Sequence, residues 1–366
     1  MRLKSEIDIA FALVRSAIDG TVPEVEHMDA SQWWSLFRLM QQNHVAAMTA
    51  DTVAALDVPR EVKIPWLAER DKAERWHRYQ REVQQEIVDT MARHGIETLV
   101  LKGTHTAQYY PQPELREFGD LDLFFYDKHD EADRMAEKEL GVTVSDKSHH
   151  HTKYDYRGVT VESHYDFLNT HYPPSNRRYE TLLKELTPSN SSPKLGEEHE
   201  VQWTSAVRAE ECAPTFEVLF LLRHMACHFA ASRITLRDLI DWALTCRALQ
   251  DKIDWSLVEK TIHDYGMTEF VAALNTIVSQ RLGIQISTNS QLSTLNSQLI
   301  ERDLVYGDKA CEESHVDGLP RLQWKLRRWR ALAWKRRMVF SDSETRLLLA
   351  SLTSHAEKPA SILHKM

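Results

Sequence analysis

The sequence predicts an α+β fold, in which a small mixed β-sheet is flanked by N-terminal and C-terminal helical regions. Most of the chain is rich in Leu, Ala, Glu, Arg and Gln, and only 11 of its 366 residues are glycine, which favours helix. Near the middle, the pattern changes to short apolar or alternating runs that are typical of strands. We therefore expect an N-terminal helical region over 1–94, an α/β core over 95–204 and a C-terminal helical domain over 205–366.

The composition limits the class of protein. The hydrophobic fraction of 42% and the charged fraction of 27% are ordinary for a soluble globular protein. The formal net charge of −9 argues against a general nucleic-acid binder. No run approaches the roughly 18 apolar residues of a membrane span. Lys4, Glu6 and Asp8 interrupt the N-terminal apolar stretch, which therefore does not resemble a signal peptide. We expect a cytoplasmic protein.

The N-terminal region is expected to begin with short helices up to about residue 60, one of them capped by Ser31. A longer amphipathic helix follows from about Pro65 to His94. Gly95 marks its end, because glycine readily adopts the left-handed conformation that closes a helix. One stripe of this helix carries the apolar residues that would face the core, namely Trp76, Val83, Ile87 and Met91.

The core region alternates strands with helices. Its expected elements are, in chain order, a buried strand over 96–101, one or two helical turns over 104–110, a strand over 120–126, a charged helix over 128–140 that ends at Gly141, and a hairpin of two strands over 151–156 and 159–167. Arg157 and Gly158 form the expected turn of the hairpin. These elements together predict a small α/β unit.

Beyond the core, residues 170–200 are rich in Pro, Ser, Asn and charge, which predicts a long, partly mobile loop. Helices are expected over 205–366. Within them, residues 285–299 repeat the tetrapeptide Asn-Ser-Gln-Leu, and we interpret this stretch as an inserted loop without chemistry.

Two aspartates stand out in the strand expected over 120–126. Asp120 and Asp122 project to the same face of a strand, because residues i and i+2 do so. Two neighbouring carboxylates repel each other unless a cation lies between them. Oxygen ligands of this kind suit Mg²⁺ or Mn²⁺. Such pairs are also common on exposed strand ends, so the pair alone is a weak signal.

Candidate phosphate ligands precede the aspartates. Lys102, Gly103 and Thr104 follow the first expected strand at a predicted helix start. Backbone N–H groups at a helix N-terminus favour phosphate, and glycine permits its close approach. Thr104 adds a hydroxyl donor, and Lys102 and Arg116 add cations that could reach the same phosphates. Structural ion pairs with acidic side chains are the competing interpretation for both cations.

A third carboxylate follows the aspartates. Thr160, Glu162 and His164 share one face of the last expected strand, opposite Val159 and Val161. An additional carboxylate on a neighbouring strand suits a two-metal phosphoryl-transfer site, where it binds a metal or takes the proton of the attacking hydroxyl. For His164, which shares this face, we favour a hydrogen-bonded structural role over a direct contact with the nucleotide.

The stretch LVLKGTHTAQYYPQPELREFGDLDLFF resembles the nucleotidyltransferase superfamily that is built on the DNA polymerase β-like core. It is most similar to an uncharacterised bacterial branch with the motif L-K-G, then Tyr-Pro, then R-x-x-x-D-[IL]-D-L. A later segment of that branch resembles VESHYDF. The similarity covers residues 96 to about 168 well, and extends more loosely into the helices around 216–265.

The resemblance implies metal-dependent transfer of a nucleotidyl group from a nucleoside triphosphate, such as ATP, to a hydroxyl acceptor on a protein, a small molecule or an RNA end. Mg²⁺ or Mn²⁺ would be the cation. The catalytic and metal-binding residues would be Asp120, Asp122 and Glu162. Gly103 and Thr104 would hold the triphosphate, and the further candidate nucleotide contacts are Lys102, Arg116 and His164. The chain departs from the usual pattern because its first motif lacks serine and its third acid is Glu rather than Asp.

Two other interpretations stay open. One is a catalytically weak or inactive nucleotide-binding or regulatory protein of the same fold. The other is a nucleic-acid-associated protein that uses the basic, Trp-rich helix expected over 318–340, which contains no acidic residue. An amphipathic helix whose tryptophans pack on the core is the favoured explanation of that segment.

Two groups of histidines lie outside the motif. His224 and His228 share one face of an expected helix. We favour for them a buried polar network over a role in closing on a nucleotide, the network partners being Arg237, Asp238 and Asp241. The triplet His149–His151 falls in an expected turn, and we assign it no function.

Overall fold

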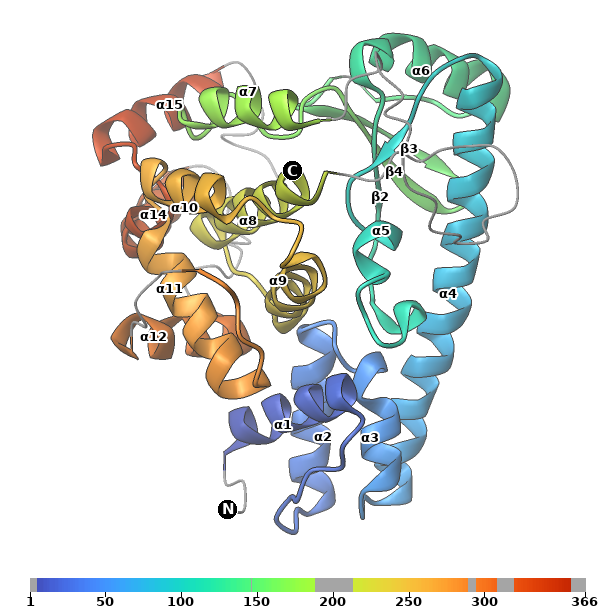
Figure 1. Cartoon of the computed structure of the whole chain (residues 1–366), viewed down its shortest axis with the longest axis vertical. Helices are drawn as coiled ribbons and strands as arrows, with labels where there is room; N and C mark the ends of the chain where they lie inside the picture. Colours follow the sequence, from blue (N-terminus) through green and yellow to red (C-terminus); the bar gives the residue numbers. More distant parts are fainter. Residues whose placement is uncertain (1–4, 146, 188–212, 289–293, 308–318, 357–366) are drawn as a thin grey trace.

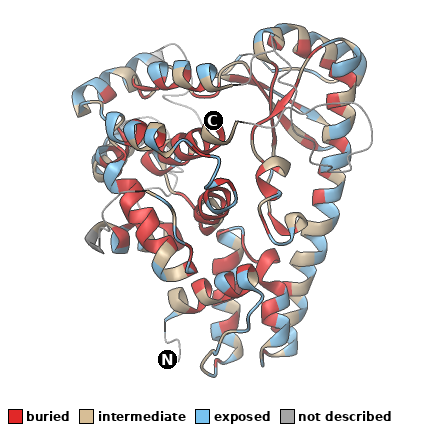
Figure 2. Ribbon diagram, in the orientation of Figure 1, coloured by how far each residue is buried: buried red, intermediate tan, exposed pale blue. Residues whose placement is uncertain are grey.

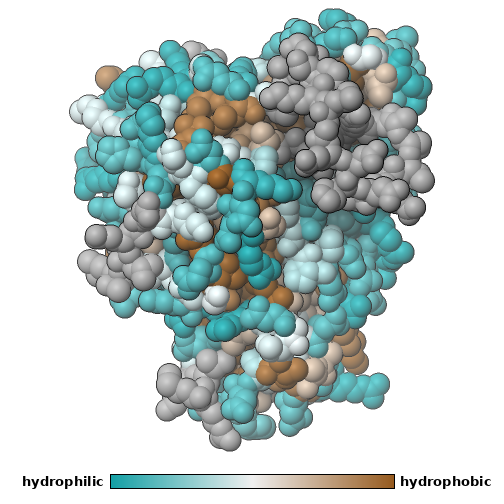
Figure 3. Space-filling view, in the orientation of Figure 1, coloured by the Kyte–Doolittle hydropathy of each residue, from teal (hydrophilic) through white to brown (hydrophobic). Residues whose placement is uncertain are grey.

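The computed structural model describes residues 5–145, 147–187, 213–288, 294–307 and 319–356 (Figure 1). It confirms the α+β class, because a four-stranded mixed sheet is accompanied by helices that precede and follow it in the chain. On the face shown in Figure 3, hydrophilic side chains dominate, and apolar ones gather in a central strip. No helix of the described part is long and apolar enough to cross a membrane.

The described helices before the sheet are α1 (Glu6–Asp19), α2 (Ala30–Gln42), α3 (Ala50–Ala55) and α4 (Arg60–Arg93). The predicted N-cap Ser31 is wrong. Asp29 caps α2, because its carboxylate and the side chain of Gln32 form a reciprocal capping box. Helix α4 begins before the predicted start at Pro65, and it is followed by Gly95, whose φ of +68° closes the helix as predicted.

The predicted apolar stripe of α4 holds only in part. Val83 is buried, as are Ile87 and Met91, whereas Trp76 is 38% exposed. Around Trp76 the helix passes between two hydrophobic clusters, and Trp76 belongs to neither of them. Its ring packs instead against Tyr79 of the same helix.

The sheet contains β1 (Leu99–Val100), β2 (Leu121–Phe124), β3 (His151–Tyr156) and β4 (Val159–His164), in the spatial order β1-β2-β4-β3. Strands β2 and β4 are parallel, and the other two pairs are antiparallel. The predicted hairpin is confirmed, because Arg157 and Gly158 both have positive φ, at 52° and 78°. Two consecutive residues of this conformation join strands tightly.

Two helices of the core complete this unit. The short α5 (Thr104–Ala107) follows β1 as predicted. Helix α6 (His129–Met135) continues as a π-helical turn to Leu140, and Gly141 caps it with a φ of +67°. Because β2 and β4 are parallel, a crossover must join them, and α6 and β3 supply it.

The two faces of the sheet meet different surroundings. Leu121 and Leu123 of β2 face α4 and form a smaller hydrophobic cluster with residues such as Val83. Phe124 points the opposite way, as alternate residues of a strand do, and joins a larger cluster. The larger cluster includes helices from both ends of the chain. Figure 2 shows buried residues on the inward sides of these helices.

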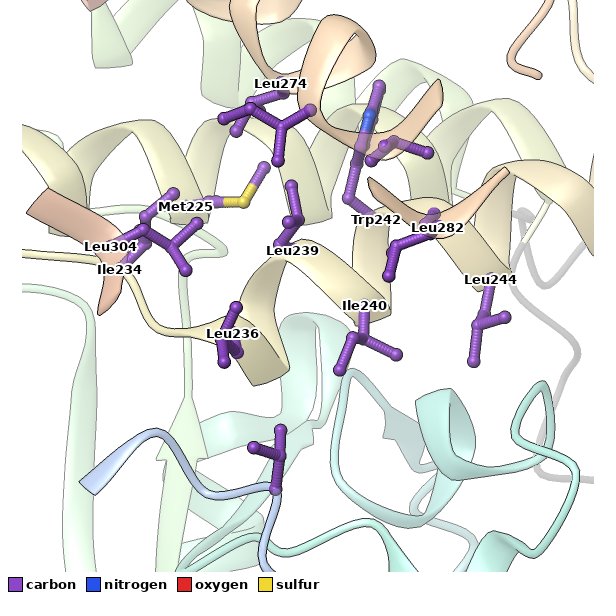
Figure 4. Packing of buried hydrophobic residues seen from close by; sticks show 14 of the residues in the cluster. Met225, Ile234, Leu236, Leu239, Ile240, Trp242, Leu244, Leu274, Leu282 and Leu304 are labelled. Atoms are coloured by element: carbon purple, nitrogen blue, oxygen red, sulfur yellow. The ribbon is translucent and has the colours of Figure 1, made fainter. Parts of the chain in front are cut away.

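The C-terminal helices are α7 (Asn176–Leu186), α8 (Pro214–Ala231), α9 (Leu236–Leu249), α10 (Trp255–Asp264), α11 (Thr268–Ile277), α12 (Thr294–Tyr306), α13 (Leu319–Ala331), α14 (Ala333–Val339) and α15 (Glu344–Ala356). Figure 4 shows the packing between α8, α9 and α11, where Met225, Leu239 and Leu274 come together in the larger cluster.

Two predicted loops are partly helical. Helix α7 lies inside the segment 170–200 that was predicted to be a loop. The segment is helical because Tyr179 and Leu183, one turn apart, are both fully buried against the core. Helix α12 begins inside the loop predicted over 285–299, and its residues Ile300 and Leu304 are buried. The remainder of the first loop, from 188, and residues 289–293 of the second lie outside the described residues.

The described part of the basic segment 318–340 makes many internal contacts. The Nζ of Lys335 is fully buried and lies 2.6 Å from the Asp303 carboxylate. The Arg336 guanidinium lies 3.7 Å from the centroid of the Trp329 ring and 3.0 Å from Glu344. Such contacts are those of an amphipathic pair of helices packed on the core.

Candidate functional site

The strand register places the predicted acidic residues together. In the parallel pair of β2 and β4, Asp122 lies beside Glu162. Asp120 immediately precedes β2, two residues before Asp122. In the antiparallel pair of β3 and β4, Lys153 lies beside Glu162. Side chains in register on adjacent strands share a face, so two carboxylates lie side by side on β2 and β4, with a lysine beside them on β3.

Asp122 is the most enclosed of the carboxylates, with only 3% of its surface exposed. Its Oδ1 lies 3.2 Å from the Nζ of Lys102 and 3.2 Å from the Nε2 of His164. Burial alone would raise the pKa of Asp122, but Lys102 and His164 outweigh it and lower the pKa. Asp122 is therefore held in its ionised form.

Glu162 has a similar environment. Its Oε1 lies 2.6 Å from the Nζ of Lys153, and its Oε2 lies 3.5 Å from the Nε2 of His164. Burial raises the pKa of Glu162, but His164 and Lys153 lower it far below its usual range. His164 shows the converse behaviour, because its buried ring lies between two carboxylates that raise its pKa to about 9 despite the opposing effect of burial. An imidazolium therefore lies between the two carboxylates.

Asp120 differs from the other two acids. Burial, followed by the charge of Asp122, raises the pKa of Asp120, and the nearby Lys102 only partly compensates. Asp122, Glu162 and His164 each offer one ligand atom, and these atoms all lie within 4.8 Å of one another. Asp120 does not belong to a cluster of this kind among the described residues.

The predicted phosphate-binding segment lies beside the carboxylates. The Nζ of Lys102 lies 3.2 Å from the Nε2 of His224 as well as from Asp122. Gly103 has φ +63° and ψ −113°, a conformation that side chains disfavour, and an added Cβ would lie 3.3 Å from the ring of Phe118. The Thr104 hydroxyl donates to the Oε1 of Gln84 at 2.5 Å.

Arg116 lies deeper than the other candidate phosphate ligands. It is buried, and its Nε and Nη2 each donate to the Asp241 carboxylate at 2.7 Å. Its Nη1 donates to the carbonyl of Gly103 at 3.2 Å. Arg116 thus ties the Gly103 turn to helix α9, and its contact with phosphate stays a prediction.

The structure adds histidines that the motif did not indicate. His151, the first residue of β3, pairs with His164, the last residue of β4. The ring centroids of His150 and His151 lie 5.3 and 5.2 Å from that of His164. The expected two-residue turn of the hairpin already implied this pairing, because His151 and His164 are equally far from Arg157 and Gly158, respectively, along the chain. The signal was therefore present in the sequence, but the triplet was assigned to a turn.

The two histidines of α8 approach the site as well. The rings of His224 and His228 are 4.4 Å apart, and His224 contacts Lys102. Burial, and then the charge of Lys102, lowers the pKa of both imidazoles, which are therefore neutral at pH 7. Helix α8 thus lies against the acidic end of the sheet.

The chain was compared with known proteins. A family model described as an uncharacterised nucleotidyltransferase matches residues 29–283, a range that includes every residue of the site. Neither the curated proteins nor the solved structures gave a match.

Proposed function

We propose that this chain, which belongs to the uncharacterised nucleotidyltransferase family, transfers a nucleotidyl group from a nucleoside triphosphate to a hydroxyl acceptor. The observation that supports the proposal best is the register of β2 and β4, which sets Asp122 beside Glu162. Carboxylates paired in this way suit a hard divalent cation such as Mg²⁺ or Mn²⁺. ATP is a candidate donor, and the acceptor would be a protein, a small molecule or an RNA end.

The residues present fit a cation. Asp122, Glu162 and His164 offer ligand atoms within 4.8 Å of one another, and both carboxylates have lowered pKa values. Asp120 adds a further carboxylate at the start of β2. A bound cation would neutralise negative charge on the phosphate oxygens.

The transfer itself would be an in-line displacement. The acceptor oxygen attacks the α-phosphorus, the bond from that phosphorus to its bridging oxygen breaks, and pyrophosphate leaves. The proton of the acceptor hydroxyl passes to a site carboxylate, for which Glu162 is the candidate. Lys102, with Gly103 and Thr104, would contact the triphosphate.

The rival with a specific observation in its favour is a nucleotide-binding protein with little or no turnover. Lys102 already neutralises Asp122, and Lys153 already neutralises Glu162. A cation must compete with these two ion pairs and with the protonated His164. In an active enzyme, Lys102 would leave Asp122 for a phosphate when the nucleotide binds.

The first experiment measures thermal stabilisation by ATP, GTP, CTP and UTP, each with and without Mg²⁺ or Mn²⁺. A ligand at about 100 times its Kd stabilises a protein by about 2.7 kcal/mol. We expect one nucleotide to raise the Tm only when a cation is present. Asp122→Asn should abolish the shift, whereas the matched control Asp127→Asn, on an exposed residue past the end of β2, should keep it. The absence of a shift with every nucleotide would contradict the proposal.

A labelling experiment then separates transfer from binding. The preferred nucleotide is supplied with ³²P at either the α or the γ position, together with cell extract as the source of acceptor. If the acceptor retains the α label and pyrophosphate is released, the result supports nucleotidyl transfer. If the acceptor retains the γ label instead, the reaction is phosphoryl transfer, which contradicts the proposal. Binding without pyrophosphate release supports the rival.

A further inference from the structure

Three histidine side chains converge at the end of the hairpin. His150 and His151 come from the start of β3, and His164 comes from the end of β4. Each offers one ring nitrogen, and the three nitrogens all lie within 4.8 Å of one another. Ligand nitrogens on one tetrahedral zinc ion are about 3.4 Å apart, given a Zn–N distance of about 2.1 Å. Small side-chain rotations would therefore bring all three onto one ion.

Two of these imidazoles have nitrogens without a hydrogen-bond partner. The Nδ1 atoms of His150 and His151 are both buried and unpaired within the described part of the chain. His151 is only 7% exposed, and the carboxylate of Glu162 is 3.7 Å away, too far for a hydrogen bond. A buried polar atom without a partner costs about 1–3 kcal/mol. Both atoms are therefore available to bind a ligand.

The third histidine has the outer contact that metal-binding histidines usually have. The Nδ1 of His164 lies 3.3 Å from the carbonyl oxygen of Asp166, and its Nε2 faces Asp122 and Glu162. A backbone contact of this kind fixes the ring. The ion would replace the proton that Nε2 now holds between the two carboxylates, since metal binding to histidine releases protons.

We propose that His150, His151 and His164 bind a divalent transition-metal ion of the zinc class. Imidazole nitrogen favours such ions, whereas Mg²⁺ favours carboxylate oxygen and water. The histidine site therefore differs in chemistry from the Asp122–Glu162 pair beside it, although the two share His164. This inference does not depend on nucleotidyl transfer, because the metal is bound without nucleotide.

The test uses the full chain without a polyhistidine tag, and Co²⁺ as a spectroscopic substitute for Zn²⁺. We expect the wild-type protein to bind one Co²⁺ with the absorption bands of nitrogen coordination, and Zn²⁺ to displace it. His150→Gln and His151→Gln should each weaken Co²⁺ binding by about tenfold or more, as loss of a metal-site contact does. His149→Gln, a substitution of the same kind at the adjacent residue outside the cluster, should leave the affinity unchanged.

Equal Co²⁺ affinity in the wild type, His150→Gln and His151→Gln would overturn the proposal. So would loss of Co²⁺ binding in Asp122→Asn combined with its retention in both histidine variants, because the ion would then lie on the carboxylates alone. Circular dichroism of each variant verifies its fold. Histidine-dependent Co²⁺ binding without any nucleotide shift would support this inference while contradicting the proposed function.

Discussion

At the scale of single residues, the site is a set of matched charges. Lys102 faces Asp122, Lys153 faces Glu162, and His164 lies between the two carboxylates. Asp122 and His164 are buried, and buried charges remain ionised only when each has a partner. Binding of a cation or a nucleotide must therefore rearrange several partners at once, so these residues should behave as a unit rather than additively.

His77 is a buried histidine outside the site whose protonation affects the stability of the fold. It lies on α4, is 4% exposed, and packs its ring edge-on against Phe118, the residue that adjoins Gly103. Burial, and then the charge of Arg81, lowers the pKa of His77 from 6.5 to about 4. Its ring is therefore neutral in the folded protein at mildly acidic pH.

We predict that His77 makes the protein sensitive to acid. Between pH 6.5 and 4 the unfolded chain protonates this histidine and the folded chain does not, so the free energy of unfolding falls as the pH falls. The loss approaches about 3 kcal/mol at the lower end, since one pKa unit corresponds to about 1.36 kcal/mol. Urea denaturation at pH 7.5 and 4.5 measures it. His77→Gln should lose this part of the pH dependence, and the exposed control His27→Gln should retain it. An unchanged pH dependence in His77→Gln would contradict the assignment.

Sequence patterns indicated which site residues share a strand face, but they did not indicate burial or partners. Strand alternation, together with the resemblance, predicted the three candidate carboxylates Asp120, Asp122 and Glu162. The ion pair of Arg116 with Asp241 joins residues far apart in the chain, so local spacing carried no sign of it.

At the scale of elements, the turn after β1 depends on a connection to α9. Arg116 bonds both to the carbonyl of Gly103 and to the carboxylate of Asp241, and the Tyr110 hydroxyl donates to the same carboxylate at 2.7 Å. Because these groups are buried, removal of the acid leaves a guanidinium without a counter-charge. The connection fixes the backbone of the Gly103 turn relative to the helical domain.

We predict that Asp241→Asn lowers the free energy of unfolding by about 3–5 kcal/mol, the usual effect of breaking a buried ion pair by removing one partner. Arg116→Met combined with Asp241→Leu should cost less, because no unpaired charge remains. Urea denaturation of the single variant, the double variant and the exposed control Asp251→Asn gives the comparison. A single variant that is as stable as the control would show that the pair does not support the turn.

The strands and their turn were predictable because alternation and a Gly-containing turn are local signals. Helices α7 and α12 were missed because Pro, Ser and Asn around them are typical of loops. Their helical character depends on tertiary burial of Tyr179, Leu183, Ile300 and Leu304. The predicted N-cap of α2, Ser31, lies two residues after the observed one, Asp29. Both residue types are good caps, and Asp29 is distinguished by the side chain of Gln32, which completes its capping box.

At the scale of the whole molecule, the sheet shares its packing with helices from both ends of the chain. One face is covered by α4, through Val83, Ile87 and Met91. On the other side, Leu99, Phe124 and Phe167 join the same large cluster as α2, α8, α9 and α11. The acidic end of the sheet is therefore held between regions that are distant in the sequence. The predicted regions 1–94, 95–204 and 205–366 thus share one core across their boundaries.

We predict that a fragment of residues 95–204 does not fold independently. Without α4 and the helices from α8 onward, both faces of the sheet would lose packing partners, and only the short helices of the fragment would remain to cover them. A small sheet needs packing to be stable. The fragment should unfold without a cooperative transition and bind a hydrophobic dye, whereas the full chain should show a sigmoidal thermal transition. Circular dichroism melts and dye fluorescence measure both. If the fragment melted cooperatively with protected backbone amides, the core would be an autonomous domain, and the packing of α4 on the sheet would be an accessory contact.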